Sequence, residues 1–526
     1  MSSLPGVPEP SLESLEHYVT ASSRVFPGPR RDREEPVARR LRMHVADLGR
    51  VLEAKCPDTH PPLARIVHPD VPSTTATRPS GLSAIRDAVV RGELDPIERV
   101  RQCLARIESV AHLNAYRHVD ADRAIAVAEA LQRSVRAGEP VGPLAGSVVA
   151  VKDSFAVAGL PMHVGSKALP VQHPEQNALV VERLMRAGAI VIGTTNMHEL
   201  GYGATNVNGH FGNVGHPLDP RLTPGGSSGG SAVAVATGTA DFSLGTDAAG
   251  SVRMPAALCG IVGFKPTFDA LSMAGMHQLS WSLDHVGILA KSVADTLAVF
   301  QVMRGATGSA APAQPDVAKP AIRLFEPQNH FFEYVRPDVA QAYRRAMQTL
   351  RHAGVLVEEG IVDGVERSPG IQFLTLCAEA SQMNGEIIAG PAAEQLGAEV
   401  RARLEAGQFL RAVDYIKAQQ MRSALLQECL RVLATADAIV TPTVVIPACV
   451  PDDVISVAGR SVPIHPTLTR CTVPFCLTGM PAVSIPCGTT EEGLPVGLQI
   501  AAAPGHDLAL LDIAYALAVL LAPLNP

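Results

Sequence analysis

The sequence predicts an α/β fold in which a mixed or parallel β-sheet is covered by helices. Short runs rich in β-branched residues alternate along the chain with segments of helical periodicity. Such alternation is typical of a sheet with helices packed on it. The 526 residues are 47% hydrophobic and 18% charged, which fits a soluble protein with a large, well-packed core.

The first 79 residues differ in composition from the rest and are rich in Pro, Arg and Glu. Their apolar residues recur every three or four positions and so form one stripe on a helix: Val37, Leu41, Val45, Leu48 and Leu52. Several prolines between positions 61 and 79 then predict a linker. We therefore expect 1–79 to be a helical extension that packs on the main domain, 80–526, or on a second copy of the chain.

The first half of the main domain alternates between predicted helices and strands. Helical periodicity predicts helices over 82–92, 95–110, 177–189 and 231–238. Compact β-branched or apolar runs predict strands over 146–153, 190–196 and 241–246. Asp95 is a suitable N-cap, with Pro96 at the first helical position after it. The strand over 146–153, GSVVAVKD, is expected to be buried and to end at Lys152.

The second half is expected to be more helical before it returns to the sheet. Residues 316–435 show mainly helical periodicity, and apolar runs over 436–443 and 481–488 predict two returning strands. The most apolar segment, 508–523, contains Asp512 and is shorter than the roughly 20 residues that span a bilayer. It is therefore predicted to be a buried C-terminal helix.

Charge and motif content argue against several function classes. A net charge of −7 without a long basic run argues against nucleic acid as a partner. The first residues, MSSLPGVPEPS, do not have the pattern of a signal peptide. Nine cysteines without a C-x-x-C pair predict reduced thiols in a cytoplasmic protein. The histidines show no metal-ligand spacing, so we expect no metal and no cofactor. Because the most apolar segment is too short to span a bilayer, we also expect no membrane partner.

Residues 224–255 combine many glycines with serine clusters at Ser227 and Ser251, 24 positions apart. A phosphate-binding loop would need a following lysine or a G-x-G-x-x-G spacing, and the segment has neither. Residues 226–230 match G-x-S-x-G with Ser228 in the centre. An α/β-hydrolase would place that serine directly after a strand, whereas the preceding residues DPRLTP predict a turn.

A third interpretation uses a lysine as the base for a serine nucleophile. A buried lysine can be neutral near pH 7 and can then accept a proton. Lys152, at the end of an apolar strand, could act in this way, and a second serine could relay the proton. The glycines would allow close backbone approach and leave N–H groups free to bind an oxyanion. This interpretation explains the many glycines, the serines and the lack of a histidine.

Six stretches resemble the amidase signature family, and they lie within residues 82–520, about four-fifths of the chain. The stretches are 142–155, 194–203, 212–238, 244–267, 280–296 and 477–500. The resemblance implies a central mixed β-sheet of about eleven strands with helices on both faces. It also implies a Ser–cis-Ser–Lys triad in the domain 80–526, with Ser251 as nucleophile, Ser227 as the bridging serine after a cis peptide bond, and Lys152 as base.

The resemblance assigns further residues around this triad. It implies an oxyanion hole formed by the backbone N–H groups of Ala248, Ala249, Gly250 and Ser251. It places Ser228 at a supporting hydrogen-bonding position. Asp247 and Arg253 would form a pair that supports the loops.

Three residues depart from the family pattern near the expected substrate pocket. They are Met162, His163 and Cys476. These three are candidate residues of the substrate pocket. His163 is also an alternative candidate for the catalytic base.

The resulting expectation is an amidase that cleaves a linear carboxylic amide through a serine acyl-enzyme, without a metal or cofactor. An alternative is the glutaminase subunit of a tRNA-dependent amidotransferase, and another is a carbamate or urea-like C–N hydrolase of the same family. A scaffold without catalytic function is disfavoured because all three triad positions are filled. The expected partners are a small amide substrate and a second copy of the chain in a homodimer.

Overall fold

A mixed β-sheet of eleven strands forms the centre of the computed structural model, which describes residues 81–305 and 322–525. The strand order is β1-β3-β2-β4-β6-β5-β12-β13-β9-β7-β8. The strands are β1 Tyr116–Val119, β2 Val148–Lys152, β3 Ile190–Thr195, β4 Phe242–Thr246, β5 Val262–Lys265, β6 Val286–Ala290, β7 Arg323–Pro327, β8 Leu356–Gly360, β9 Ala438–Pro442, β12 Ala482–Thr489 and β13 Pro495–Ala501. Strands β3, β2 and β4 are parallel, as are β9, β7 and β8, and the other neighbours pair antiparallel. This confirms the predicted fold class.

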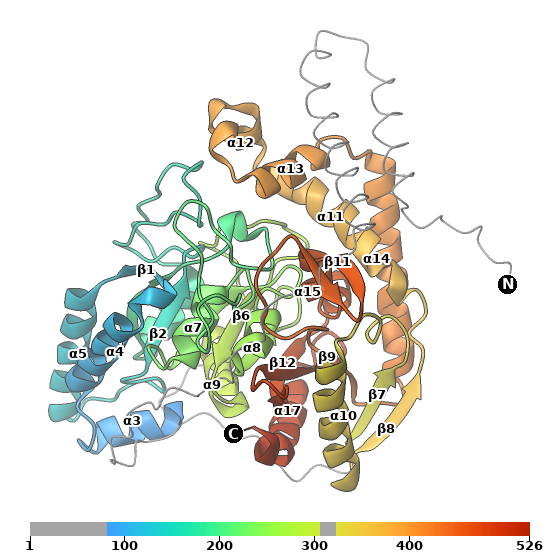
Figure 1. The fold of residues 1–526 in the computed structure, drawn as a ribbon. Coiled ribbons are helices and arrows are strands. Elements are labelled where there is room, and N and C mark those ends of the chain that lie inside the picture. The colour runs from blue at the N-terminus through green and yellow to red at the C-terminus, as the bar shows by residue number, and fades with distance from the viewer. Residues whose placement is uncertain (1–80, 306–321, 526) are drawn as a thin grey trace, which may run out of the picture.

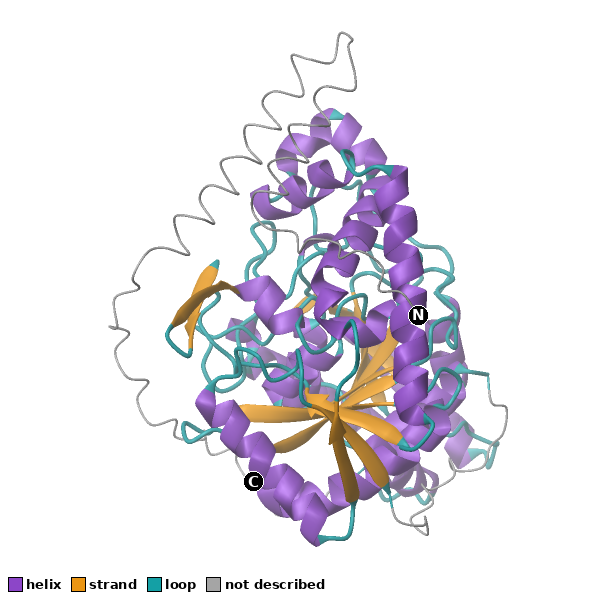
Figure 2. Ribbon diagram, turned by 90° about the vertical axis from the view of Figure 1, so that its right-hand side faces the viewer, coloured by secondary structure: helices purple, strands orange, loops and turns teal. Residues whose placement is uncertain are grey.

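Helices cover both faces of the twisted sheet (Figure 2). One face carries α3 Leu82–Val90, α6 Leu179–Arg186, α9 Val293–Met303, α10 Pro337–His352 and α17 Asp507–Leu521. The other face carries α4 Pro96–Ser109, α5 Ala121–Arg136, α7 Gly229–Ala236 and α8 Arg253–Cys259. Fully buried strands such as β2 and β4 lie between these layers, which explains their continuous apolar sequences.

A group of helices lies beyond one edge of the sheet layers and forms part of the wall of the site described below (Figure 1). It consists of α11 Ser368–Met383, α12 Gly385–Ala389, α13 Ala398–Gly407 and α14 Ala412–Leu433. Two short helices pack nearby, α15 Ile464–Thr469 and α16 Val473–Leu477, and β10 Val454–Val457 pairs with β11 Arg460–Pro463 as a separate hairpin. The short 3-10 helices are Ala111–Leu113, Glu199–Gly201, Val365–Arg367, Pro391–Gln395 and Ala522–Leu524.

The predicted elements of the first half appear in order. Each predicted helix and strand between 82 and 246 corresponds to an observed one within a few residues. The Asp95 side chain accepts a hydrogen bond from the backbone N–H of Ile97 at 2.8 Å, as expected for an N-cap. The returning strands over 436–443 and 481–488 are β9 and β12.

The prediction of mainly helical structure over 316–435 missed two strands within the described part, β7 and β8 at one edge of the sheet. Strand β8, LVEEG, is half-exposed, and Leu356 at its start is 55% exposed. An exposed edge strand has little apolar alternation, so its sequence carries a weak signal. The segment 1–79 lies outside the described residues, and the division into 1–79 and 80–526 stays a prediction.

The apolar C-terminal helix packs on the sheet, where α17 contacts α9, α10 and β12. Among the described residues, the stretch Asp507–Leu524 is long and apolar enough to cross a membrane by length and composition alone, with a mean hydropathy of 1.9. Its side chains at Leu510, Leu511 and Leu517 are fully buried in the main core. This is the position of a core helix.

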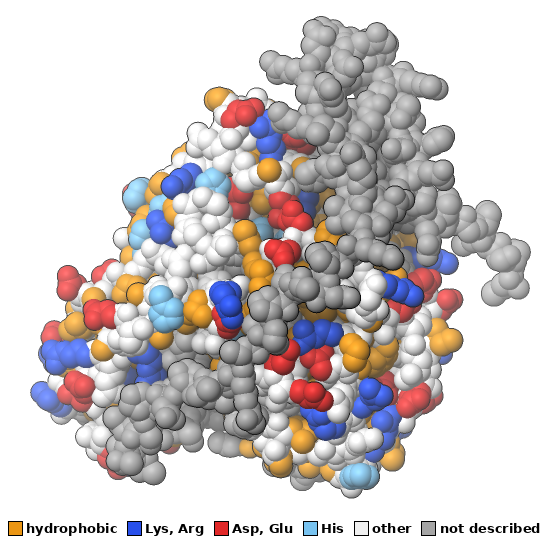
Figure 3. All heavy atoms as spheres, viewed as in Figure 1, with side chains coloured by type: hydrophobic (Ala, Val, Ile, Leu, Met, Phe, Trp, Pro, Cys, Tyr) orange, Lys and Arg blue, Asp and Glu red, His pale blue; other side chains and the backbone are white. Residues whose placement is uncertain are grey.

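The face of the molecule in Figure 3 carries acidic and basic side chains interspersed. No continuous patch of one sign is visible among the described residues on that face. It therefore offers no broad single-sign field to a charged partner.

Candidate active site

Lys152 ends β2, the third strand from one edge of the sheet, which lies between its parallel neighbours β3 and β4. Its side chain is fully buried, and Nζ donates to Ser227 Oγ at 2.7 Å and to Thr246 Oγ1 at 2.6 Å. Burial lowers the pKa of Lys152 to about 7, although the carboxylates of Asp284 and Asp247 oppose this shift. The amine is therefore poised between its charged and neutral forms near neutral pH.

Ser227 lies in the loop before α7, and its peptide bond to Gly226 is cis. A Cβ atom at Gly226 would lie 2.8 Å from the backbone nitrogen of Asn206, so only glycine fits there without a shift. The backbone N–H of His198 donates to the Ser227 carbonyl oxygen at 3.2 Å. These contacts fix the loop so that the Ser227 hydroxyl faces Lys152.

Ser251 lies in the loop between β4 and α8, and it is 6% exposed. Ser228 joins this loop to the first one: its N–H donates to the Ser251 carbonyl oxygen at 3.2 Å, and its hydroxyl donates to the Thr246 carbonyl oxygen at 3.2 Å. Ser227 and Ser251 make no direct hydrogen bond, but both line the same small cavity. Catalytic hydrogen bonds are often longer in an unliganded enzyme than in its substrate complex.

Asp247 and Arg253 form a fully buried ion pair beneath the Ser251 loop. Arg253 donates to both carboxylate oxygens at 3.0 Å. Burial alone would raise the pKa of Asp247, but the Arg253 guanidinium holds it well below its usual range. The Cys476 thiol also donates to this carboxylate, at 3.1 Å, and burial raises the pKa of the thiol to about 12.

The turn before Ser251 presents backbone N–H groups, but fewer than predicted. The N–H of Gly250 donates to Asp247 Oδ1 at 2.7 Å and so is already engaged. Within the part of the chain that the structure describes, the N–H groups of Ala248, Ala249 and Ser251 have no acceptor. Gly250 contributes through its backbone shape instead: its φ is +120°, and a Cβ there would lie 2.1 Å from Thr472 Oγ1. The expected set of four free donors is thus reduced to three.

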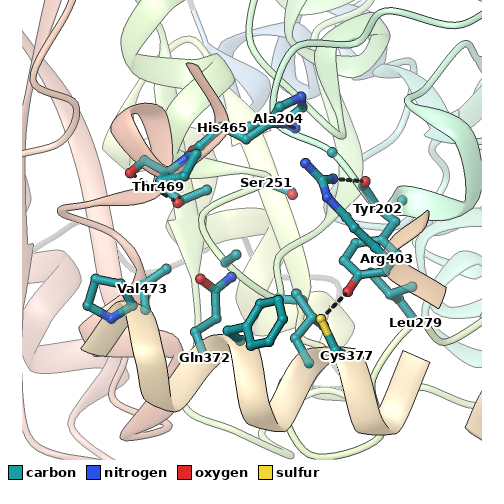
Figure 4. A pocket seen from close by; sticks show the side chains of 18 of the residues that line it. Tyr202, Ala204, Ser251, Leu279, Gln372, Cys377, Arg403, His465, Thr469 and Val473 are labelled. Atoms are coloured by element: carbon teal, nitrogen blue, oxygen red, sulfur yellow. Dashed lines mark hydrogen bonds between the residues drawn. The ribbon is translucent and has the colours of Figure 1, made fainter. Parts of the chain in front are cut away.

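A cavity of about 220 Å³ opens in front of Ser251 (Figure 4). Its walls are mostly apolar, and they include Met254, Leu279, Phe373, Leu376 and Val473. Helix α11 supplies one side of the cavity, with Gln372 and Cys377 pointing inward in Figure 4. The site therefore offers space for an apolar group next to the Ser251 hydroxyl.

One corner of this cavity is polar but electrically compensated. Glu399 pairs with both Arg403 and His465, and the distance to His465 Nε2 is 2.7 Å. Burial would raise the pKa of Glu399, but the hydrogen bond from His465 and the charge of Arg403 lower it to about 2. Arg403 also donates to the Tyr202 carbonyl oxygen at 2.7 Å. The positive charge at this corner is thus already neutralised by protein groups.

A second, much smaller cavity of about 10 Å³ lies deeper. It adjoins the first at Ser251, and its lining includes Ser227, Ser154 and Asp284. The sequence analysis did not identify Ser154, Asp284 or Arg403 as residues of the site. Ser154 lies in the turn that directly follows Lys152, where the Phe155 N–H donates to the Lys152 carbonyl oxygen at 3.0 Å. Asp284 and Arg403 are brought to the site by packing alone.

The sequence of this domain matches the pattern of the Amidase family over residues 98–511. The chain belongs to the amidase signature family. The A subunit of the glutamyl-tRNA(Gln) amidotransferase of Chloroflexus aurantiacus is 33% identical over 468 residues, which cover 82% of this chain and 94% of that protein. Its counterpart in Methanosarcina barkeri is 34% identical over 408 residues, covering 71% and 84% of the two chains.

Solved structures of amidase signature enzymes share the fold. A crystal structure of an amidase is 32% identical, with a TM-score of 0.79, and the match covers 84% of this chain and all of that one. The peptide amidase of Stenotrophomonas maltophilia is 26% identical, with a TM-score of 0.72, covering 84% and 97% of the two chains. This amidase signature protein is accordingly an enzyme that cleaves the C–N bond of an amide.

The three residues predicted as possible pocket residues of this enzyme do not line the cavity at Ser251. Met162 lines a separate depression, and Cys476 lies behind the ion pair described above. His163 Nδ1 is 3.4 Å from His118 Nε2 and 3.9 Å from Asp153 Oδ2. Burial lowers the pKa of His163 to about 4. Cys476 contacts the buried Asp247 carboxylate and His163 stacks on His118, so neither side chain lines the cavity.

Metal-ligating side chains do not gather in the described ranges. There, no three His, Cys, Asp or Glu side chains come together in an arrangement that could hold a metal ion. The expected independence of the activity from metals stays a prediction to be measured.

Proposed function

We propose that this enzyme hydrolyses a carboxylic amide through an acyl-enzyme on Ser251, with Ser227 and Lys152 as proton carriers. The observation that carries the proposal is the fully buried Lys152 amine, which contacts Ser227 Oγ at 2.7 Å and has no carboxylate within ion-pair distance in the described ranges. A lysine in such surroundings can be neutral and act as a base.

The proposed first step forms a bond between Ser251 Oγ and the amide carbon. The Ser251 proton passes to Ser227 Oγ as the Ser227 proton passes to Lys152 Nζ. Ser227 then gives its proton to the leaving nitrogen as Lys152 Nζ returns a proton to Ser227 Oγ, and the C–N bond breaks while Ser251 Oγ keeps the acyl group. Water attacks the resulting ester by the same proton route, and this step releases the acid and restores the free Ser251 hydroxyl.

Backbone donors support the charge that develops on the carbonyl oxygen. The N–H groups of Ala248, Ala249 and Ser251 are free to donate, whereas Gly250 holds the turn through Asp247. Fixed donors aimed at a developing oxyanion are often the largest single contribution to the rate in acyl transfer.

Replacement of Ser251 tests the proposal. Ser251→Ala is expected to lower kcat by on the order of 10⁴-fold or more, because members of a catalytic unit depend on one another. Mass spectrometry with a slowly hydrolysed ester should show one acyl group on the wild-type enzyme and none on Ser251→Ala. Ser228→Ala is the comparison at the neighbouring serine cluster. An active Ser251→Ala together with an inactive Ser228→Ala would contradict the assignment.

A glutaminase subunit of an amidotransferase is the second candidate, because the named relatives are amidotransferase subunits. Free glutamine carries an α-ammonium group, which a binding site usually pairs with a carboxylate. The described residues that line the 220 Å³ cavity include no Asp or Glu. This favours an uncharged amide with an apolar acyl group. The test compares rates for glutamine and for aryl or alkyl amides, using the purified chain alone.

The expected homodimer and the cytoplasmic location stay predictions. Light scattering on the purified full-length chain measures the first. A single copy per particle would contradict it.

A further inference from the structure

We infer that the small cavity beneath Ser251 is the leaving-group site and that its size restricts this enzyme to primary amides, which release ammonia. The inference rests on the proposed function of Ser227 as the donor that protonates the leaving nitrogen. It specifies a narrower substrate class, primary amides, than membership of the family does.

The two cavities divide the space around the reacting carbon. Ser251 lines both cavities, whereas Ser227 lines only the smaller one. The carbonyl oxygen of the substrate is drawn to the backbone N–H groups before Ser251. The leaving nitrogen must come within hydrogen-bond distance of Ser227 Oγ, so it must enter the small cavity. The acyl group is then left with the 220 Å³ cavity.

The volume of the leaving-group site sets the size limit. It measures about 10 Å³, which is room for about one molecule of the size of water. Ammonia has this size, whereas methylamine adds a second heavy atom and aniline adds a ring. The walls are well packed: Met197 is fully buried and Leu200 is 1% exposed.

The polar lining matches the two N–H bonds of a primary amide. The Ser154 hydroxyl is buried and has no hydrogen-bond partner in the described structure. Asp284 accepts the N–H groups of Leu279 and Ser280 on Oδ2, at 2.7 and 3.1 Å, and no described hydrogen bond reaches its Oδ1. A primary amide can offer one N–H to each of these acceptors. An N-substituted amide would lose one of these bonds and leave a buried polar group unpaired.

His277 closes the leaving-group site on its far side. It lines both this site and a larger surface depression that Met162 and Met383 also line. Backbone pairing holds it there, since the His277 N–H donates to the Ser154 carbonyl oxygen at 2.8 Å. A substituent on the leaving nitrogen that extended toward this depression would have to displace the His277 side chain.

The test compares a primary amide, its N-methyl derivative and its 4-nitroanilide, all with the acyl group that a primary-amide panel shows to be best. For the wild-type enzyme, kcat/KM for the N-methyl amide should be lower by about 100-fold or more. The anilide should also be poor, although its leaving group is chemically better. Rejection of the more reactive substrate separates a size limit from intrinsic reactivity.

Two methionines provide a matched pair of variants. Met197 and Met254 are both fully buried, but Met197 lines only the leaving-group site and Met254 only the larger cavity. Met197→Ala should raise the N-methyl to primary ratio of kcat/KM by about tenfold or more, while Met254→Ala should keep it within about threefold. His277→Ala, which opens the other wall, should raise the ratio in the same direction and serves if Met197→Ala does not fold.

The outcomes separate this inference from the proposed function. If the wild-type enzyme cleaves the N-methyl amide within about tenfold of the primary amide, and Ser251→Ala is inactive, the size limit is wrong while the triad stands. If the wall variants fold and cleave the primary amide but leave the ratio unchanged, the inference is also wrong. If no primary amide is cleaved, or if Ser251→Ala stays active, the proposed function fails and the inference fails with it.

Discussion

Lys152 is the residue whose replacement tests the proposed chemistry most directly. Burial lowers its pKa from 10.5 to about 7. A change of this size corresponds to about 5 kcal/mol of disfavoured charge. At pH 7, about half of such side chains are neutral, whereas an ordinary lysine is neutral in about 0.03% of molecules. Because only the neutral amine can accept the proton, kcat/KM should rise with pH through about 7 and then level off.

Two substitutions separate the charge of Lys152 from its shape. Lys152→Arg keeps a cation whose pKa stays above about 12, so it cannot act as a base and should be inactive. Lys152→Met keeps an unbranched side chain without a titrating group and should also be inactive. The neighbouring Asp153 needs its own control, because burial raises its pKa to about 7 as well. Its carboxylate accepts the N–H of His163 and is not paired with Lys152, so Asp153→Asn should retain the pH profile.

Lys152→Met also allows a measurement of stability that does not depend on substrate. A lowered pKa means that the unfolded chain binds more protons than the folded one between about pH 7 and 10. The wild-type enzyme should therefore gain about 1.4 kcal/mol of unfolding free energy per pH unit in this window, relative to Lys152→Met. Below about pH 7 the difference should be constant, because both states are then protonated. Urea unfolding at a series of pH values measures it.

Three results would refute this reasoning. The first is a wild-type pH profile that is flat from about pH 5 to 10. The second is near-normal turnover by Lys152→Arg, which would show that Lys152 is not the base. The third is a difference in unfolding free energy between wild type and Lys152→Met that does not change with pH.

Three further predictions concern the loops, metals and the N-terminal segment. Gly250→Ala should destabilise the fold by about 2 kcal/mol or more and lower kcat, because its φ is +120° and a Cβ would lie 2.1 Å from Thr472 Oγ1; urea unfolding and kinetics check both, and an unchanged enzyme would contradict it. Activity should survive dialysis against a chelator, because the lysine generates the nucleophile; a loss that added zinc restores would contradict this. A chain beginning near Ser80 should retain turnover in a direct rate assay, since Lys152, Ser227 and Ser251 lie outside the removed segment; a folded but inactive truncation would contradict this.

The sequence predicted several elements in their correct order, including β2, β3 and β4, and it named the residues of the proposed triad, but it did not predict β7 and β8. The strand signal before Lys152 is strong because β2 is buried on both faces and must be apolar throughout. The glycines around Ser227 and Ser251 are visible as letters, and the structure shows that backbone atoms or side chains occupy the space a Cβ would need at Gly226 and Gly250. The periodicity that predicts β2 is local to the chain, whereas the contacts that require glycine come from distant residues, Asn206 at Gly226 and Thr472 at Gly250.

Only the tertiary structure decided the shape and polarity of the cavities. Glu399 and Arg403 both lie on α13. Glu399 contacts His465 of α15 because the helices beyond the sheet edge pack together. The engagement of the Gly250 N–H by Asp247, and the position of Cys476 behind that carboxylate, likewise depend on distant segments that meet. Hydrogen bonds and burial between residues far apart in sequence leave no periodic signal, so the pattern that predicts a buried strand cannot predict which side chains line the space beside it.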